Sequence, residues 1–398
     1  MKKLLLKSVV GLSPLLSFAP AYASFYDEVD GKFDLGHHIA ENATGFLPIP
    51  ILITEPALGY GGGIAGLILH ETPEEKRQRK KAALEAVDGG AQLMPSAISI
   101  VGAAGSANGS WFAFGGHQHS WLDDKIRYLG GGGAGVVNLD IYQDISIPGF
   151  ETPIGDFPGF NKELSFATKT SAAAMLQKVQ FRVGETALML GVKQVLAISK
   201  VESDNKVVDK VFEFALGDKS ITSGLGLYLD YDKRNSFFYP TQGYRLQAET
   251  MVYDEKIGSD SNYSNTSYKG EGYVPLSRKW NLGFAGSYQK FSTDDVFVSP
   301  TTKPYIDLRG IAAYRYQGDE VATLQSQLSY NIDNRWIVSA FYGAGEAQNH
   351  YDNGEGYIDA YGVGFRYQIA RRYGLHLGLD LAKSNDDGAI YVNIGTGF

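Results

Sequence analysis

Between positions 373 and 381 the chain reads YGLHLGLDL, and this stretch decides the fold. Every odd position from Tyr373 to Leu381 is apolar, whereas the positions between them carry glycine, histidine and aspartate. A two-residue period is typical of a β-strand that turns one face to an apolar environment and the other to a polar one. The stretch therefore predicts a strand with one apolar face.

The same alternation recurs at 361–369, 280–288 and 390–398. A soluble β-sandwich also alternates, but its outer faces carry many charges. Here the polar faces are rich in Gly, Ser, Asn and Gln, and aromatic residues gather near the ends of the segments. This combination is typical of transmembrane β-barrels, whose strands face lipid on one side and a wet lumen on the other. The pattern favours an all-β, antiparallel transmembrane barrel.

The first residues indicate export. A lysine-rich start precedes an apolar run from Leu4 to Phe18, which Pro14 interrupts, and small residues stand at Ala21 and Ala23. We expect a signal peptide at residues 1–23, because the run is too short and too broken for a membrane anchor.

The composition agrees with a barrel of the outer membrane. The chain has 25 Tyr, 21 Phe and 48 Gly but no Cys, and no apolar run beyond the signal is long enough for a transmembrane helix. Its formal net charge of −8 argues against nucleic acid as a partner. We expect a multi-pass barrel in the outer membrane of a Gram-negative bacterium, with no cofactor.

Counting backward from the C-terminus predicts sixteen strands. They are placed near 388–398, 373–383, 356–369, 335–347, 320–332, 280–297, 264–276, 242–254, 219–232, 186–201, 165–183, 138–148, 125–137, 110–120, 96–106 and 51–69. An even number puts both termini in the periplasm, with a short periplasmic segment at 24–50 and the barrel at 51–398.

Short links are expected on the periplasmic side and long loops outside. The short links are 107–109, 184–185, 236–242, 277–279, 333–334 and 371–372, and the long loops are 70–95, 149–164, 202–218, 255–263, 298–319 and 348–355.

One long loop is expected to contain a helix at 72–90. Thr72 is a capping residue, Pro73 suits the first helical position, and Gly89 and Gly90 would end the helix. The sequence leaves open whether this helix plugs the barrel or is part of a solvated extracellular loop.

The stretch from Asp230 to Gly243, DYDKRNSFFYPTQG, resembles a known family signature. Its Asp230, Arg234, Pro240 and Gly243 are similar to the Asp-x-Arg-Asn and Phe-x-Pro-x-x-Gly elements of the bacterial surface antigen family, the barrel domain of the BamA/TamA superfamily. Further similar segments are Leu308–Ile311, Phe341–Gly345, Ile390–Phe398 and Ile53–Tyr60.

The resemblance implies a barrel whose long loop before the twelfth strand folds back into the lumen. Arg309 and Gly310 would then form the loop tip. The family usually holds this arginine with acids, but the matching positions here are Gln327 and Gly343. Because a buried arginine without a carboxylate is costly, we expect Asp380 to face it beside Gln327. The alternative is a solvated loop arginine.

The resemblance also implies interactions at the two ends of the chain. The terminal aromatic Phe398 would be read by the barrel assembly machinery that inserts this protein into outer-membrane lipid. Residues 24–50 are too few for a POTRA module, so we expect a stand-alone barrel that could serve a separate periplasmic or secreted client.

The implied function is translocation or insertion of protein or lipid through a weak seam between the first and last strands. We place this seam between 57–66 and 390–398, where glycines are frequent, although glycines could equally accommodate barrel curvature. The alternative function is a passive porin-like channel lined by Arg245, Glu249, Arg366, His376 and Asp380.

An enzyme is not expected. His117, His119 and Ser120 lie together at one strand end, but no partner acid or oxyanion donor can be named. The two histidines share a strand face and could hold a metal, yet an exposed strand-end pair is the more ordinary interpretation.

Overall fold

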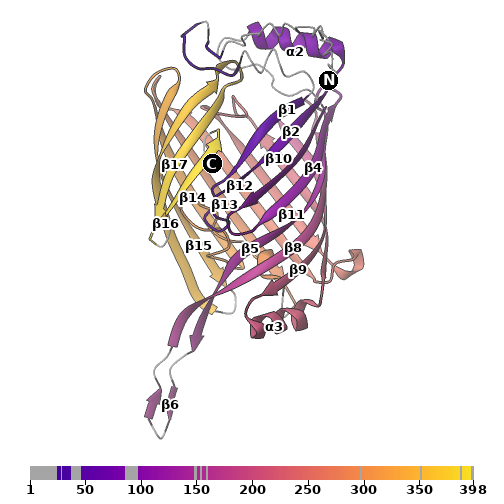
Figure 1. Cartoon of the computed structure of the whole chain (residues 1–398), viewed down its shortest axis with the longest axis vertical. Coiled ribbons are helices and arrows are strands. Elements are labelled where there is room, and N and C mark those ends of the chain that lie inside the picture. Colours follow the sequence, from indigo (N-terminus) through magenta and orange to yellow (C-terminus); the bar gives the residue numbers. More distant parts are fainter. Residues whose placement is uncertain are drawn as a thin grey trace, which may run out of the picture.

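The computed structural model describes residues 25–27, 29–36, 46–85, 97–147, 150–152, 155–157, 160–295, 298–349, 352–385 and 388–395. Within these ranges the chain forms a 16-stranded antiparallel sheet that curls into a barrel wall (Figure 1). The expected signal peptide at 1–23 and the terminal Phe398 lie outside the described residues.

The strands follow one another around the wall in chain order. They are β1 (Phe46–Ile53), β2 (Gly61–His70), β3 (Ala97–Ser106), β4 (Trp111–Trp121), β5 (Ile126–Ile147), β8 (Phe160–Arg182), β9 (Leu188–Ser203), β10 (Ser220–Asp232), β11 (Gly243–Tyr253), β12 (Tyr263–Pro275), β13 (Trp280–Thr293), β14 (Glu320–Asn331), β15 (Trp336–Asn349), β16 (Asp352–Ala370), β17 (Leu375–Ser384) and β18 (Gly388–Ile394).

The connections carry the remaining elements. They are the hairpin β6 (Phe150–Thr152) and β7 (Gly155–Phe157), the helices α2 (Pro73–Glu85) and α3 (Lys206–Leu216), and the short helices η1 (Glu255–Ile257), η2 (Pro300–Thr302) and η3 (Arg371–Tyr373). No helix in the described ranges is long and apolar enough to cross a membrane.

The count of sixteen is confirmed, but two of the predicted boundaries are wrong and compensate each other. The expected strand 51–69 is two strands, β1 and β2, joined by a turn at 54–60 in which Gly59 has a φ of +74°. The expected break near Val137 does not exist, because β5 pairs with β8 without interruption from Ile126 to Ile147. These two strands continue beyond the rest of the wall toward the β6–β7 hairpin (Figure 1).

With these boundaries, the first loops lie at the opposite end of the barrel from the one predicted. Successive connections alternate between the two ends of the barrel, so α2, in the described part 71–85 of the connection after β2, lies at the same end as the short turns 183–187 and 276–279. That end faces the periplasm, because short turns gather there. The extracellular placement of 70–95 and the periplasmic placement of 107–109 are therefore both wrong.

Helix α2 begins as the sequence predicts. The Thr72 hydroxyl accepts a hydrogen bond from the amide of Glu75 at 3.2 Å, and the Glu75 carboxylate accepts one from the amide of Thr72 at 2.7 Å. This capping box fixes the first turn. The helix lies at the end of the barrel where the described chain begins (Figure 1), and residues 86–90 of the expected helix lie outside the described part.

The outer surface of the barrel is apolar, as the alternation predicts. On β17, Leu377, Leu379 and Leu381 are each about 40% exposed, while His376, Gly378, Asp380, Ala382 and Ser384 are buried on the inner face. Tyr373 departs from the prediction. It lies in η3 and is only 3% exposed, because the chain turns before β17 begins.

Candidate functional site

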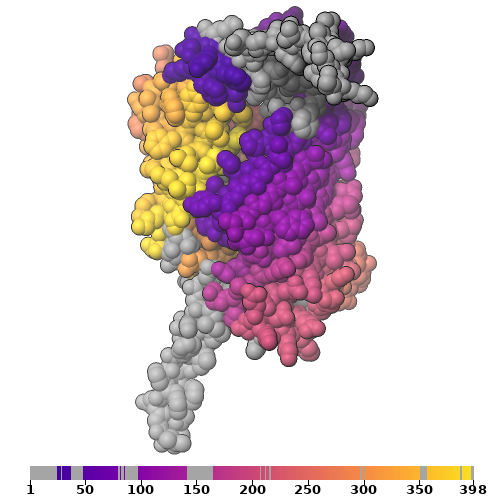
Figure 2. Space-filling model, viewed as in Figure 1, coloured from indigo at the N-terminus to yellow at the C-terminus, as the bar shows by residue number. Residues whose placement is uncertain are grey.

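The two ends of the sheet, β1 and β18, meet on one face of the molecule (Figure 2). No backbone ladder joins them within the described ranges. A polar contact beside them joins the amide of Val392, which donates, to the hydroxyl of Thr54 in the turn after β1, at 3.4 Å. We call this junction the seam.

The prolines of β1 explain part of the missing backbone pairing between the described parts of β1 and β18. The carbonyl of Ile51 faces β2, since it lies 3.2 Å from where a Cβ on Gly62 would be. Residues two apart in a strand direct their backbone groups to the same side, so Pro48 and Pro50 face the opposite edge. Proline has no N–H to donate. The edge of β1 at the seam therefore lacks two of its donors.

The glycines assigned to the seam lie elsewhere. Gly61 and Gly63 belong to β2, which is fully paired with β1 and β3. A Cβ on Gly61 would come within 2.3 Å of the carbonyl oxygen of Gly105, and one on Gly63 within 2.1 Å of that of Ala103. The prediction that 57–66 forms the seam is wrong, and these two glycines permit close packing of neighbouring strands instead.

At the other edge, β18 ends at a left-handed residue. Gly395 has a φ of +100°, and its amide donates to the carbonyl of His376 at 3.0 Å. Its own carbonyl accepts a hydrogen bond from Nε of the buried Arg366 at 3.0 Å. A Cβ at this position would lie 2.5 Å from the carbonyl oxygen of Phe238. The chain thus bends toward the inner face of the wall and stops β18 after seven residues.

The loop before β14 places Arg309 against the inner wall. Its Nη1 donates to Gln327 Oε1 at 3.0 Å and to Asp380 Oδ2 at 2.9 Å, and its guanidinium lies 3.6 Å from the ring centre of Phe341. Asp380 is fully buried and also pairs with Arg366, with Nη2 to Oδ2 at 2.9 Å. The structure brings both candidate partners to Arg309.

Glycines in the wall make room for this loop. A Cβ on Gly343 would lie 3.1 Å from the side chain of Leu308, and one on Gly345 would lie 2.6 Å from that of Ile306. Both loop residues are nearly inaccessible to solvent and pack against a cluster of wall residues. Gly343, expected from the family pattern to be an acid, is thus part of the surface on which the loop rests.

The same loop touches both edges of the seam. The amide of Gly310 donates to the hydroxyl of Tyr391 on β18 at 2.9 Å. The amide of Ala313 donates to Glu55, in the turn after β1, at 3.1 Å. Gly310 has a φ of +97° and packs against β17, which a larger residue could not do without strain. A cavity of 470 Å³ lies between the loop, this turn and β18.

The family turn motif forms a set of ion pairs at the periplasmic end. Asp230 accepts two hydrogen bonds from Arg245, at 2.8 and 2.9 Å, and Arg234 bridges Asp232 and Glu271 at 2.7 and 3.0 Å.

Gly243 and Pro240 fix the shape of this turn. A Cβ on Gly243 would lie 2.1 Å from the carbonyl oxygen of Lys233, and Pro240 is buried. The motif holds the turn between β10 and β11, and nothing in its arrangement requires a catalytic role.

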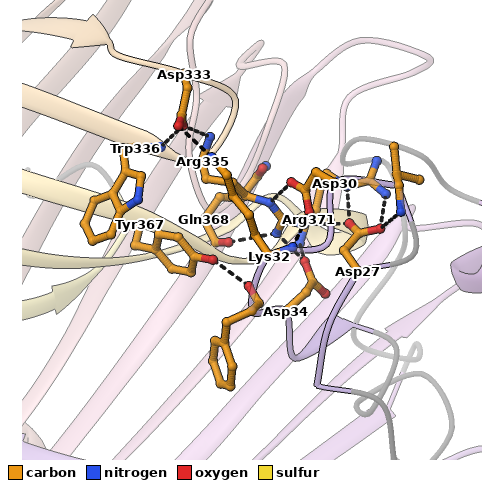
Figure 3. A network of polar contacts seen from close by, with 12 residues as sticks. Asp27, Asp30, Lys32, Asp34, Asp333, Arg335, Trp336, Tyr367, Gln368 and Arg371 are labelled. Carbon is orange, nitrogen blue, oxygen red and sulfur yellow. Dashed lines mark hydrogen bonds and ion pairs between the residues drawn. The ribbon is translucent and has the colours of Figure 1, made fainter.

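A second arginine cluster, not foreseen from the sequence, ties the N-terminal segment 25–36 to the periplasmic turns (Figure 3). Arg335 is fully buried and contacts the carboxylates of Asp27, Asp30 and Asp34. Arg371 pairs with Asp27 through Nη2 at 2.9 Å.

The charges in this cluster shift one another's ionisation. The hydrogen bond from Arg371 is the main cause that lowers the pKa of Asp27 to about 2, and Arg335 likewise lowers the pKa of Asp30. These shifts are the expected effect of neighbouring cations that stabilise the ionised carboxylates. The cluster contains three acids and two arginines, a pattern that carries no sequence signal because residues about three hundred positions apart meet in it.

The histidines considered as metal ligands lie on β4. Within the described ranges, no group of three or more His, Cys, Asp or Glu side chains is arranged to hold a metal ion.

Comparison with known proteins shows which family model and which solved structures this barrel resembles. The Omp85 superfamily domain matches residues 161–305, which include the turn motif. The structure resembles BamA from Haemophilus ducreyi lacking POTRA domains 1-3, with a TM-score of 0.57 and 12% identity over 88% of this chain and 68% of that one.

It also resembles two CdiB structures. CdiB from Acinetobacter baumannii gives a TM-score of 0.54 at 12% identity, and CdiB from Escherichia coli gives 0.51 at 8%. Each match covers 88% of this chain, which spans 59% and 61% of the two CdiB chains. No curated protein matches the sequence.

The fold and its outward apolar face define an outer-membrane β-barrel. The Omp85 superfamily domain matches part of this barrel, and the fold is similar to the barrels of BamA and CdiB.

Proposed function

We propose that this barrel translocates or inserts protein or lipid at the outer membrane by opening the seam between β1 and β18. The observation that carries the proposal is that no ladder joins the described parts of β1 and β18, where β1 presents Pro48 and Pro50 to the open edge. Opening a wall elsewhere would break a continuous row of backbone hydrogen bonds in lipid, which is prohibitively costly. At the seam this cost is largely absent.

The loop that carries Arg309 would then hold the closed state. Its contacts with Tyr391 and Glu55 bridge the two edges without backbone pairing between the strands. Such side-chain contacts can be exchanged for contacts with a client, which could arrive from a separate periplasmic protein. Phe398 would serve the assembly machinery during the barrel's own insertion.

A disulfide across the seam tests the proposal. The native chain has no cysteine, so Thr54→Cys with Val392→Cys introduces a single cross-link at their contact across the seam. The matched control, Leu379→Cys with Val392→Cys, links two residues that already pair within the wall.

The measurement is the outer-membrane protein and lipid profile of a deletion strain complemented with each variant. We expect the oxidised seam variant to behave like the deletion and to recover with reductant, while the control complements in both states. Full complementation by the cross-linked seam variant would refute the opening.

The prolines offer a second test. Pro48→Val with Pro50→Val restores two donors to the open edge and should slow hydrogen exchange in β1 and β18. Ile49→Val with Ile51→Val is the control, because these residues direct their backbone groups toward β2. Unchanged exchange in the proline variant would show that the missing donors do not keep the seam open.

The channel alternative is less well supported by the interior. Several lumen charges are paired, as in Arg245 with Asp230 and Lys193 with Glu249 at 2.7 Å, and the Arg309 loop rests on the inner wall. We therefore expect little steady conductance in planar bilayers. A large, stable open state would favour the passive channel.

A further inference from the structure

Three histidines and a serine share one face of neighbouring strands. In the register of the wall, His70 on β2 and His119 on β4 both lie opposite Ala97 of β3. Ser99, two residues further along β3, lies opposite His117. Residues directly opposite each other in a sheet point to the same side, so all four polar side chains lie on one face. The sequence alone had grouped His117 and His119 but not His70 or Ser99.

This face is the outer one. Val101, two positions from Ser99, is 51% exposed, and Trp121, two positions from His119, is 42% exposed. The intervening residues Ile98 and Ile100 instead pack against the buried cluster at the periplasmic end of the interior. The histidines and the serine therefore point away from the lumen.

Their side chains are linked by hydrogen bonds. His70 Nε2 lies 2.8 Å from Ser99 Oγ, which lies 2.9 Å from His117 Nδ1. The hydroxyl can accept from one ring and donate to the other. When both rings are neutral, the ring that accepts from Ser99 carries its proton on its other nitrogen. The two rings together therefore keep one N–H donor that does not contact Ser99. The ring of His119 stacks on Trp121, with centroids 4.1 Å apart.

The position of the cluster corresponds to the depth of lipid headgroups. Trp121, Trp280 and Trp336 stand at the periplasmic ends of their strands and are all 42–44% exposed. Outward tryptophans at strand ends form the aromatic girdle at a membrane interface. The cluster begins two residues from Trp121, where phosphate and ester groups replace hydrocarbon.

The segment that follows the cluster is basic. Helix α2 starts three residues after His70, and its sequence PEEKRQRKKAALE contains five Lys or Arg against three Glu. The chain as a whole has a formal net charge of −8. Helix α2 lies at the periplasmic end of the barrel, where it contacts η3 (Figure 1), and a positive helix close to a membrane attracts anionic headgroups.

We infer that His70, Ser99, His117 and His119, together with the basic α2, form a binding site for the phosphate group of phospholipids in the periplasmic leaflet. The imidazole N–H groups donate hydrogen bonds to phosphate oxygens, Ser99 orients the rings of His70 and His117, and the lipid chains lie along the apolar outer face above them. The site lies one strand away from the seam, but its occupancy does not depend on seam opening.

The experiment uses the full-length protein in a neutral detergent. Native mass spectrometry counts the lipids retained after incubation with dioleoyl phosphatidylglycerol, or with dioleoylglycerol, which lacks the phosphate. The variant replaces His70, His117 and His119 with Leu, which suits an outward apolar face and should leave folding intact. We expect about a tenfold loss of phosphatidylglycerol retention, the effect of roughly one lost charge-assisted hydrogen bond, and little retention of dioleoylglycerol by either protein.

The control replaces Tyr342, Tyr357 and Tyr361, which are exposed on β15 and β16 on the other side of the seam, with Leu. It should retain phosphatidylglycerol like the wild type. Equal retention by the histidine variant and the wild type would overturn the site, and displacement of the lipid by millimolar inorganic phosphate would overturn its assignment to lipid. Release of fatty acid that Ser99→Ala abolishes would replace binding with hydrolysis.

Discussion

Two arginine clusters hold the loop and the N-terminal segment, and they are built differently. Inside the barrel, Arg309 and Arg366 share the carboxylate of Asp380, which is fully buried. At the periplasmic rim, Arg335 and Arg371 meet three aspartates of segment 25–36. Among the described contacts, the interior cluster therefore shares one acid, whereas the rim cluster has three.

This difference predicts how each cluster responds when one of its charged side chains is replaced. Removing one partner of a buried ion pair leaves a charge that the surroundings cannot solvate. The side chain of Asp380 is inaccessible to solvent, whereas that of Asp30 at the rim is 22% exposed and can be hydrated. We expect one substitution in the interior cluster to lower the stability of the barrel strongly. In the rim cluster, the loss should grow with the number of ion pairs removed.

The largest effect is expected for Asp380→Asn. It removes the carboxylate that both Arg309 and Arg366 contact, so the barrel should lose about 3–5 kcal/mol of unfolding free energy. Urea unfolding in detergent, followed by tryptophan fluorescence, measures the loss. Glu249→Gln, which affects a single lysine pair, is the control and should cost less. Wild-type stability of Asp380→Asn would contradict the central role of this acid.

The next effect is expected for Arg335→Met. Three aspartates lose their shared cation, so segment 25–36 should detach from the turns while the wall stays folded. Limited proteolysis should then cleave within this segment at least tenfold faster, which corresponds to roughly 1.4 kcal/mol. Arg278→Met, at an exposed periplasmic turn, should cleave like the wild type. Barrel unfolding in place of local release would show that the rim cluster supports the wall itself.

Acid should release the same segment. The folded pKa of Asp27 is lowered from 3.8 to about 2, so its ionised form stabilises the cluster above pH 4. That contribution, about 2 kcal/mol, is lost as the pH falls from 4 through 2. Hydrogen exchange in segment 25–36 should therefore accelerate between pH 4 and pH 2. In Asp27→Asn the acceleration should be smaller, and an identical profile would exclude Asp27 as its cause.

The smallest effect is expected for Lys32→Ala. Its ion pair with Asp333 spans 2.6 Å, but both side chains are about 40% exposed. Exposed pairs contribute below roughly 1 kcal/mol. The proteolysis rate of segment 25–36 should change less than twofold. A change as large as that of Arg335→Met would mean that the exposed pair, and not the buried arginine, holds the segment.

Local patterns in the sequence were enough to predict the wall. Alternation is a property of neighbouring residues, so the strands of the C-terminal half lie close to their predicted positions. It was less reliable for β1, which includes Pro48 and Pro50 and which the predicted strand 51–69 had merged with β2. Proline is tolerated there because β1 is an edge, and edges are not visible in local spacing.

The sequence by itself determined an antiparallel barrel with one lipid-facing side and most strands of its C-terminal half, because strand period and turn residues are encoded locally. Only the tertiary structure decided which strands stay unpaired, which acids surround Arg335, and that His70 and Ser99 join His117. Each of these depends on the register between segments far apart in the chain, and register is fixed by closure of the whole sheet.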